Sequence, residues 1–298
     1  MLLAFLALVA RLCGAELEPF RYTHFLGRAL RFDNIEQRVC EPEGGGVVCD
    51  PVVIMAGRGH TGSANLAAFL QNHTELSFGT TKEHRFFSGR SVGTVDRYRR
   101  QFDIASAAER RFGFDATPAY ERHPARIFGL LPRVKVLLAV RDEVDHGMSQ
   151  LYISDGDEFH AWTRKHLLPS SVDKFQRRWC AYGIVDAFVR TFGRDQVLVL
   201  ASETLRNYRD EVLDDIQRFV GVSRERPRLP VVAICKRERY KGRFGGCYNG
   251  TSKVLPQTRA LWAPLFAECH ANLENLLQVR PGTLFNGGPT VKRSNGFV

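Results

Sequence analysis

The stretch from Pro51 to Leu66, PVVIMAGRGHTGSANL, decides the fold. It opens with an apolar, β-rich run that is typical of a buried strand. A glycine-rich turn follows at 57–62, and the next residues indicate a helix with Leu66, Phe69 and Leu70 on one face. Such a strand, turn and helix direct several backbone N–H groups and a helix N-terminus toward one point, which favours an anion. The segment therefore predicts a P-loop-like phosphate-binding turn.

Other apolar runs extend this unit into a sheet. Lys135–Val140 (KVLLAV) and Gln196–Leu200 (QVLVL) indicate two more buried strands, Leu76–Thr80 a further one, and Arg209–Val220 a helix. Continuous apolar strands that alternate with helices are typical of a parallel sheet covered on both faces. The predicted fold class is therefore α/β, with a central parallel sheet and helices on both faces. In such folds, ligands bind beyond the carboxyl ends of the strands.

The glycine-rich turn departs from the loop of kinases and ATPases. Gly57 and Gly62 match the first part of G-x-x-x-x-G-K-[ST], but Ser63 stands at the lysine position and Ala64 at that of the metal-binding hydroxyl. The turn thus lacks both the cation and the magnesium ligand of that chemistry. A tight βα turn that needs glycine only for its backbone is the alternative interpretation.

Composition sets wide limits on function. The chain has 298 residues, of which 44% are hydrophobic and 25% charged, so a crosslinked mini-protein, a coiled coil and wholesale disorder are excluded. Lys and Arg number 42 against 32 Asp and Glu, which gives a net charge of +10. This excess predicts an anionic partner, although a basic solvated surface explains it equally.

The N-terminus and the cysteines point to the secretory pathway. Residues 1–15, MLLAFLALVARLCGA, are expected to form a signal peptide, because the apolar run is too short to span a bilayer. Six of the seven cysteines lie beyond it. The pairs Cys40 with Cys49 and Cys235 with Cys247 each flank a short segment and are expected to close a loop, although six cysteines allow 15 pairings.

Two glycosylation sequons, at Asn72 and Asn249, agree with that compartment, and we expect a protein of the Golgi lumen or a secreted one. Four parts are expected along the chain: a signal peptide at 1–15, an irregular N-terminal segment at 16–50, an α/β domain at 51–280 and a tail at 281–298. Residues 227–256 are expected to be irregular as well.

Several motifs together resemble the sulfotransferases that use 3′-phosphoadenosine 5′-phosphosulfate (PAPS), in particular the Golgi carbohydrate branch with the heparan sulfate enzymes. The likeness runs in the same order from about Val52 to Leu277. The matching segments are His60-Thr61-Gly62-Ser63 for the phosphosulfate loop, Lys82 to Phe87 for K-E-x-x-F-F, Thr117 to Tyr120 for T-P-x-Y, and Arg141 with Ser149 eight residues on for the 3′-phosphate motif.

The resemblance implies a sulfotransferase-like domain at 51–280 with PAPS as the cosubstrate and no metal. It implies that Glu83 is the general base and that His60 takes part in catalysis. The residues expected to bind PAPS are Arg58, Gly59, His60, Thr61, Gly62, Ser63, Ala64, Arg141, Ser149 and Lys253. Glu83 and Arg141 also have alternative, purely structural interpretations. Glu83 could form a surface ion pair with Lys82 and Arg85, and Arg141 could form one with Asp142 or Asp145.

The sequence departs from the family pattern at three places. His60 replaces the loop lysine, Ala116 replaces a lysine that often precedes T-P-x-Y, and the late S-K-G-R-x-x-P loop keeps only Ser252-Lys253 and Pro256. A histidine carries its charge below about pH 6.5, so His60 suits a mildly acidic Golgi, and Arg58 is the second candidate cation.

The predicted function is transfer of a sulfuryl group to a hydroxyl or amine of a carbohydrate-like acceptor. The predicted partner is this acceptor, with basic residues hinting that it is acidic, and no nucleic acid or spanning membrane segment is expected. Two alternatives stay open. One is a noncatalytic basic glycan-binding protein of the same fold, and the other is a small-molecule kinase.

Overall fold

A computed structural model describes the chain over residues 24–25, 40–43, 46–88, 93–102, 112–153, 155–226, 254–279 and 281–285. Its centre is a sheet with the strand order β1-β8-β7-β4-β6-β5. The strands are β1 (His24–Phe25), β4 (Val53–Gly57), β5 (Leu76–Ser77), β6 (Phe112–Asp115), β7 (Lys135–Val140) and β8 (Val197–Ala201). All neighbours pair in parallel except β1, which lies antiparallel along the edge of β8.

The central strands form because both of their faces are covered. Every residue of β4, β6 and β8 is buried, and β7 is buried from Val136 onward. Strands with two buried faces need continuous apolar runs, which is the pattern that the sequence carries. The predicted parallel sheet is thus confirmed, and the predicted strand Lys135–Val140 has the observed bounds.

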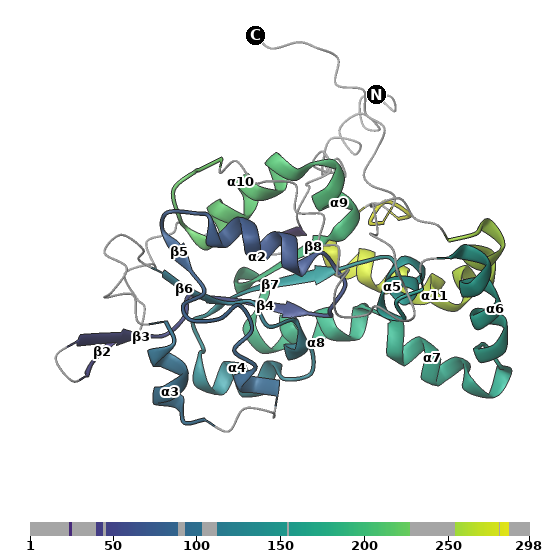
Figure 1. Ribbon diagram of the computed structural model, residues 1–298. Coiled ribbons are helices and arrows are strands. Elements are labelled where there is room, and N and C mark those ends of the chain that lie inside the picture. Colours follow the sequence, from purple (N-terminus) through teal and green to yellow (C-terminus); the bar gives the residue numbers. More distant parts are fainter. Residues whose placement is uncertain are drawn as a thin grey trace, which may run out of the picture.

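Helices cover the two faces of the sheet (Figure 1). On one face lie α2 (Ser63–Gln71), α9 (Ser202–Asn207) and α10 (Arg209–Val220), and on the other lie α3 (Val95–Arg100), α4 (Pro124–Leu130) and α8 (Tyr182–Phe192). Short 3₁₀ turns occur at Phe86–Ser88, Pro118–Tyr120, Pro169–Ser171 and Arg194–Gln196.

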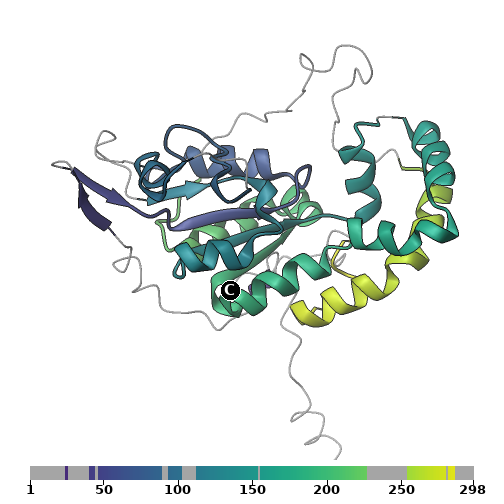
Figure 2. The same cartoon turned by 90° about the horizontal axis from the view of Figure 1, so that it is seen from below.

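A helical lobe lies beyond the carboxyl end of β7 (Figures 1 and 2). It consists of α5 (Glu143–Gln150), α6 (Gly156–His166), α7 (Val172–Trp179) and the long α11 (Pro256–Leu277). Aromatic side chains of α6, α7 and α11 form its own core, with Trp262 fully buried at the centre. The C-terminal part of α11 continues along α8, so one helix joins the lobe to the sheet.

Some expectations need correction. The segment 16–50, expected to be irregular, contains β1 and a hairpin of β2 (Cys40–Glu43) with β3 (Gly46–Cys49). The strand expected at Leu76–Thr80 ends at Ser77. Both differences concern elements of two to four residues, which are too short to show a periodic pattern. Most of the predicted irregular stretch 227–256 lies outside the described residues.

In the part of the chain that the structure describes, no helix combines the length and the apolar character needed to cross a bilayer.

Gly57 closes β4 where β4 and β7 run side by side, and it supports a specific prediction. Its φ is +115°, and a Cβ at this position would lie 2.9 Å from the carbonyl oxygen of Ala139. We expect Gly57→Ala to lower the free energy of unfolding by about 2 to 4 kcal/mol, because backbone strain and overpacking each cost about 1 to 3 kcal/mol. Urea denaturation measures this change.

The matched control is Gly59→Ala in the same turn, where a Cβ would meet no atom within 4 Å. It should change the free energy of unfolding by less than about 1 kcal/mol. Equal losses in the two variants would contradict the explanation.

Candidate functional site

The turn between β4 and α2 has an unusual backbone. His60 has a φ of +67° and Gly62 a φ of +81°, so a left-handed residue stands in the middle of the turn and another at its end. For a non-glycine residue such as His60 this conformation is uncommon and persists only where the surroundings impose it.

The surroundings act on the carbonyl groups of the turn. Four successive carbonyl oxygens accept hydrogen bonds from side chains at 2.8 to 2.9 Å: Arg58 from Thr61 Oγ1, Gly59 from His146 Nε2, His60 from Arg141 Nη1, and Thr61 from Ser202 Oγ. In a planar trans peptide the C=O and the following N–H point in opposite directions. The amides of residues 59–62 are therefore directed away from the groups that hold the carbonyls, as in an anion-binding nest.

The predicted 3′-phosphate residues lie against this turn. Arg141 follows β7 directly, is 7% exposed, and reaches the His60 carbonyl with its guanidinium. Ser149, in the second turn of α5, places its Oγ 3.2 Å from His60 Nδ1, and the ring of Tyr152 stands edge-on to the imidazole at 4.9 Å. The structure thus brings His60, Arg141 and Ser149 into one place.

The acidic neighbours of Arg141 have a partner on the lobe. Asp142 caps the N-terminus of α5 by accepting from the amides of Val144 and Asp145. Both Asp142 and Asp145 form ion pairs with Arg259 of α11, at 3.2 and 2.8 Å. The two carboxylates expected as alternative partners of Arg141 are therefore held by a different arginine.

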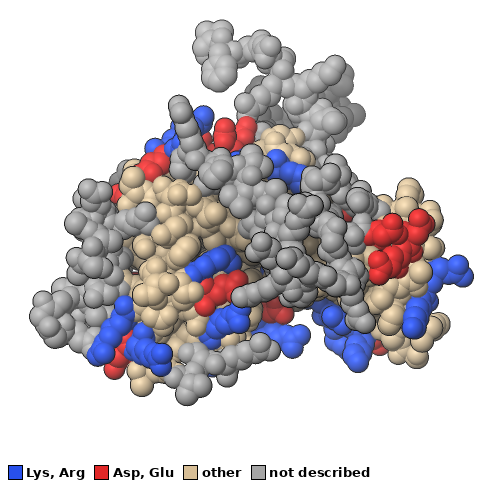
Figure 3. Space-filling model, in the orientation of Figure 1, with Lys and Arg blue, Asp and Glu red and all other residues tan. Residues whose placement is uncertain are grey.

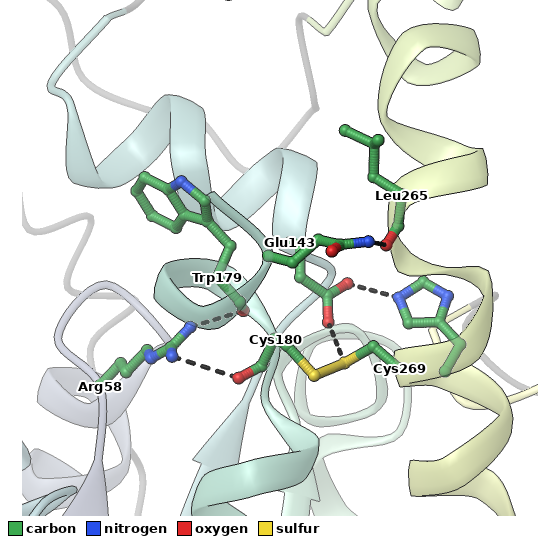
Figure 4. Close-up of a disulfide and its surroundings, with 8 residues drawn as sticks. Arg58, Glu143, Trp179, Cys180, Leu265 and Cys269 are labelled. Carbon is green, nitrogen blue, oxygen red and sulfur yellow. Dashed lines mark hydrogen bonds and ion pairs between the residues drawn. A yellow bond between two sulfur atoms is a disulfide. The ribbon is translucent and has the colours of Figure 1, made fainter. Parts of the chain in front are cut away.

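Arg58 turns its side chain away from the turn. Its guanidinium donates to the carbonyls of Trp179 and Cys180, at 2.5 and 3.2 Å, at the C-terminus of α7 (Figure 4). Burial lowers the pKa of Arg58, against the opposing effect of the Glu121 and Glu143 carboxylates. To reach a ligand, this side chain would have to leave two carbonyls.

A disulfide lies behind the same carbonyls. Cys180 is bonded to Cys269 of α11, so the end of α7 is tied to the long helix (Figure 4). Glu143, buried beside the sulfurs, pairs with His270, and its charge outweighs the effect of burial and raises the pKa of His270. Cys40 and Cys49 stand opposite one another in the β2–β3 hairpin, while Cys235 and Cys247 lie outside the described residues.

Glu83 lies on the segment after β5 and forms two ion pairs. Its carboxylate accepts from Lys82 Nζ at 3.0 Å and from Arg85 Nη2 at 2.9 Å. Partial burial favours its neutral form, but these hydrogen bonds outweigh burial and hold the pKa of Glu83 below its usual value. Because its pKa is lowered, the Glu83 carboxyl is ionised near pH 7, and its side chain is 31% exposed.

A buried carboxylate at the end of β6 holds the segment of Glu83 in place. Asp115 accepts hydrogen bonds from the Tyr98 and Tyr120 hydroxyls and from both the hydroxyl and the amide of Thr117. Thr117 Oγ1 in turn accepts from the amide of Arg85 at 3.1 Å. The T-P-x-Y motif thus positions the backbone beside Glu83. The motif was predicted from the sequence, whereas the role of Asp115 was not.

The other predicted ligands are placed as follows. Ser63 and Ala64 form the first residues of α2, immediately after the left-handed Gly62. A small hollow beside the turn is lined by Arg58, Thr61, Arg141, His146 and Trp179 together with apolar residues of β7 and α8. Lys253 lies outside the described residues. Among the residues that the structure does describe, no cluster of three His, Cys, Asp or Glu side chains fits a metal ion.

Glu203, at the start of α9, is a buried carboxyl group near the turn. It is 8% exposed, its Oε1 lies 3.4 Å from the amide of Asp142, and its Oε2 has no hydrogen-bond partner among the described residues. Burial is the main cause that raises the pKa of Glu203 to about 7. The charges of Asp142 and Asp145 act in the same direction and that of Arg141 opposes them.

The chain is similar in sequence to known sulfotransferases. No family model matches the chain. The chain is 28% identical over 123 residues to the membrane-associated sulfotransferase kil1 of Dictyostelium discoideum, covering 40% of this chain and 26% of that protein. It is 28% identical over 200 residues to bifunctional heparan sulfate N-deacetylase/N-sulfotransferase 1 of Homo sapiens, covering 59% and 23%. The chain thus spans about a quarter of the length of these curated relatives.

A solved structure supports the fold. The crystal structure of a sulfotransferase from Alicyclobacillus acidocaldarius has a TM-score of 0.54 and 21% sequence identity, over 78% of this chain and 98% of that one. At this identity the likeness concerns the fold alone.

The raised pKa of Glu203 predicts a pH dependence of stability. The pKa in the folded state, about 7, lies above the value of 4.5 for an unperturbed glutamate, so the folded protein binds more protons between these values. The free energy of unfolding should therefore fall as pH rises from 4.5 to 7, by about 3 kcal/mol from this group. Glu203→Gln should remove that part of the fall, as urea denaturation at about pH 5 and about pH 8 would measure.

The control is Glu268→Gln, which removes the same charge from an exposed position on α11. It should keep the pH dependence of the unchanged protein, and a Glu203→Gln variant that behaves like it would refute the assignment.

Proposed function

We propose that this chain, which is similar in sequence to sulfotransferases, transfers a sulfuryl group from PAPS to a hydroxyl or amine of a carbohydrate-like acceptor. The observation that carries the proposal is the turn after β4, whose four carbonyls are held by side chains while Arg141 and Ser149 lie against it. This arrangement fits a ligand with two anionic groups.

The donor would be held at both ends. The amides of residues 59–64 and the N-terminus of α2 suit the 5′-phosphosulfate, because both direct partial positive charge at one point. Arg141 and Ser149 suit the 3′-phosphate, since a guanidinium binds phosphate with paired hydrogen bonds. The side chain of His60, beside Ser149, would neutralise charge on the leaving phosphate. Lys253 is kept as a further proposed contact.

The chemistry follows from alignment and charge. Glu83 would accept the proton of the acceptor hydroxyl or amine while the acceptor atom forms a bond to sulfur. The bond from sulfur to the phosphate oxygen breaks, and adenosine 3′,5′-bisphosphate leaves. Glu83 is ionised and partly exposed, which suits a base, and an acceptor would have to take the place of one of its ion pairs.

The compartment is proposed from independent features. The Cys180–Cys269 disulfide and the exposed side chain of Asn72 support passage through the secretory pathway, where disulfides and N-glycans form. Basic and acidic side chains are interspersed on the face that Figure 3 shows. The acidity of the acceptor therefore rests on net charge, and a glycan is proposed because several relatives, the human protein among them, bear heparan sulfate in their names.

Binding of the donor product provides the first test. Adenosine 3′,5′-bisphosphate at about 100 times its dissociation constant should stabilise the folded protein by about 2.7 kcal/mol, whereas ATP with magnesium should not. Arg141→Ala should lose the stabilisation, and Arg190→Ala, an exposed arginine of α8, should keep it. Differential scanning calorimetry measures the shift in Tm. Stabilisation by ATP with magnesium alone would favour a kinase.

Transfer of labelled sulfur provides the second test. With PAPS and a panel of glycans, Glu83→Gln should lower kcat by about 100-fold or more, because a general base contributes about 10² to 10⁴. Binding of the bisphosphate should stay within about twofold, since Glu83 contacts the acceptor side. Glu268→Gln is the charge-matched control. A kcat of Glu83→Gln equal to that of the unchanged protein would refute the assignment of Glu83 as the general base. Strong, salt-dependent binding of a glycan without transfer of sulfur would instead favour a noncatalytic glycan-binding protein.

A further inference from the structure

His146 is a polar residue buried directly behind the turn. It lies one turn into α5, is 3% exposed, and lines the small hollow that Arg58, Thr61 and Arg141 also line. Its ring packs edge-on against Trp179, with the ring centroids 5.4 Å apart. A polar ring is costly to bury unless it is hydrogen-bonded, so the buried imidazole calls for an explanation in terms of its hydrogen bond.

That hydrogen bond goes to the backbone of the turn. Nε2 of His146 lies 2.9 Å from the carbonyl oxygen of Gly59. A carbonyl can only accept, so Nε2 carries the proton. Burial, with the charges of Arg58, Arg141 and His60, lowers the pKa of His146 to about 3, against the effect of the bond to Gly59. The ring is therefore neutral near pH 7, and its single N–H is committed to Gly59.

The bond selects one of two orientations of the Gly59–His60 peptide. A flip of this peptide would turn the Gly59 carbonyl outward and the His60 amide inward, and it would move His60 from its φ of +67° to an ordinary negative value. Local backbone preference therefore favours the flipped form. The orientation seen here, with the His60 amide directed away from His146, needs a donor behind the Gly59 carbonyl.

We propose that His146 is a positioning residue that holds the Gly59–His60 peptide so that the His60 amide faces the anionic group of the donor. This inference rests on the proposed function, because it requires an anion at the turn. Arg141 holds the next carbonyl in the same way, but it is also expected to contact the ligand. The N–H of His146 is used by the Gly59 carbonyl, so substitution of His146 tests the positioning of the turn rather than a hydrogen bond to the ligand.

The test compares His146→Leu with His146→Gln. Leucine fills the space without a donor, whereas the amide of glutamine can reach the Gly59 carbonyl in place of Nε2. Isothermal titration with adenosine 3′,5′-bisphosphate should show about tenfold weaker binding for His146→Leu, the effect of one lost hydrogen bond and a buried unpaired carbonyl. For His146→Gln the Kd should stay within about twofold of the unchanged protein.

A measurement on the unchanged protein covers the case in which His146→Leu does not fold. Nitrogen-15 NMR should show the imidazole of His146 protonated on Nε2 and constant from about pH 5 to about pH 8. The His60 amide should shift strongly when the bisphosphate binds. A proton on Nδ1, or an unmoved His60 amide on binding, would overturn the proposal.

The variants distinguish a failure of the role of His146 from a failure of the proposed function. Equal Kd values for the leucine variant and the unchanged protein would refute the role of His146 and leave the proposed function intact. Equally weak binding by both variants would show that the hydrogen bond is not what matters, and would also refute it. If the unchanged protein binds neither the bisphosphate nor inorganic pyrophosphate, the proposed function fails and the role of His146 with it.

Discussion

The site depends on one constraint, which is that four successive backbone carbonyls of the turn all accept hydrogen bonds from side chains. The carbonyls of residues 58–61 are held by side chains from the turn itself, from Arg141 just after β7, from α5, and from α9. A buried carbonyl without a donor is costly, so each of these bonds fixes the plane of one peptide. Because successive peptides are fixed, the amides on their other edges are arranged before any ligand arrives, and the cost of ordering them is met during folding.

The helical lobe supports this turn from behind. Arg58 joins the turn to the end of α7, and the disulfide from Cys180 to Cys269 joins the end of α7 to α11. The turn and α11 are far apart in sequence, but they are linked through one guanidinium and one covalent bond. The fixed orientation of the turn is thus a property of the sheet and the lobe together.

Much of this could be predicted from the sequence, and the rest could not for identifiable reasons. Lys135–Val140 was predicted with its observed bounds because a strand buried on both faces reads as a continuous apolar run, here from Val136 to Val140. The meeting of His60 with Arg141 followed from topology, since neighbouring parallel strands end at one edge. His146 was missed because its partner is a backbone carbonyl, which carries no residue identity in the sequence. The helix Pro256–Leu277 was missed because it changes partners along its length and contains Pro264, so it has no single apolar stripe.

Charge at the strand ends explains why the long helix matters to the site. Asp142 and Asp145 stand next to Arg141 in the chain, and a guanidinium paired with either would be less available to a phosphate. Arg259 of α11 forms ion pairs with both carboxylates. The acidic first turn of α5, which stabilises the helix N-terminus, is thereby compensated by a basic residue of the lobe. Arg141 itself donates to the His60 carbonyl of the turn, and in the proposed function the same guanidinium also contacts the anionic ligand.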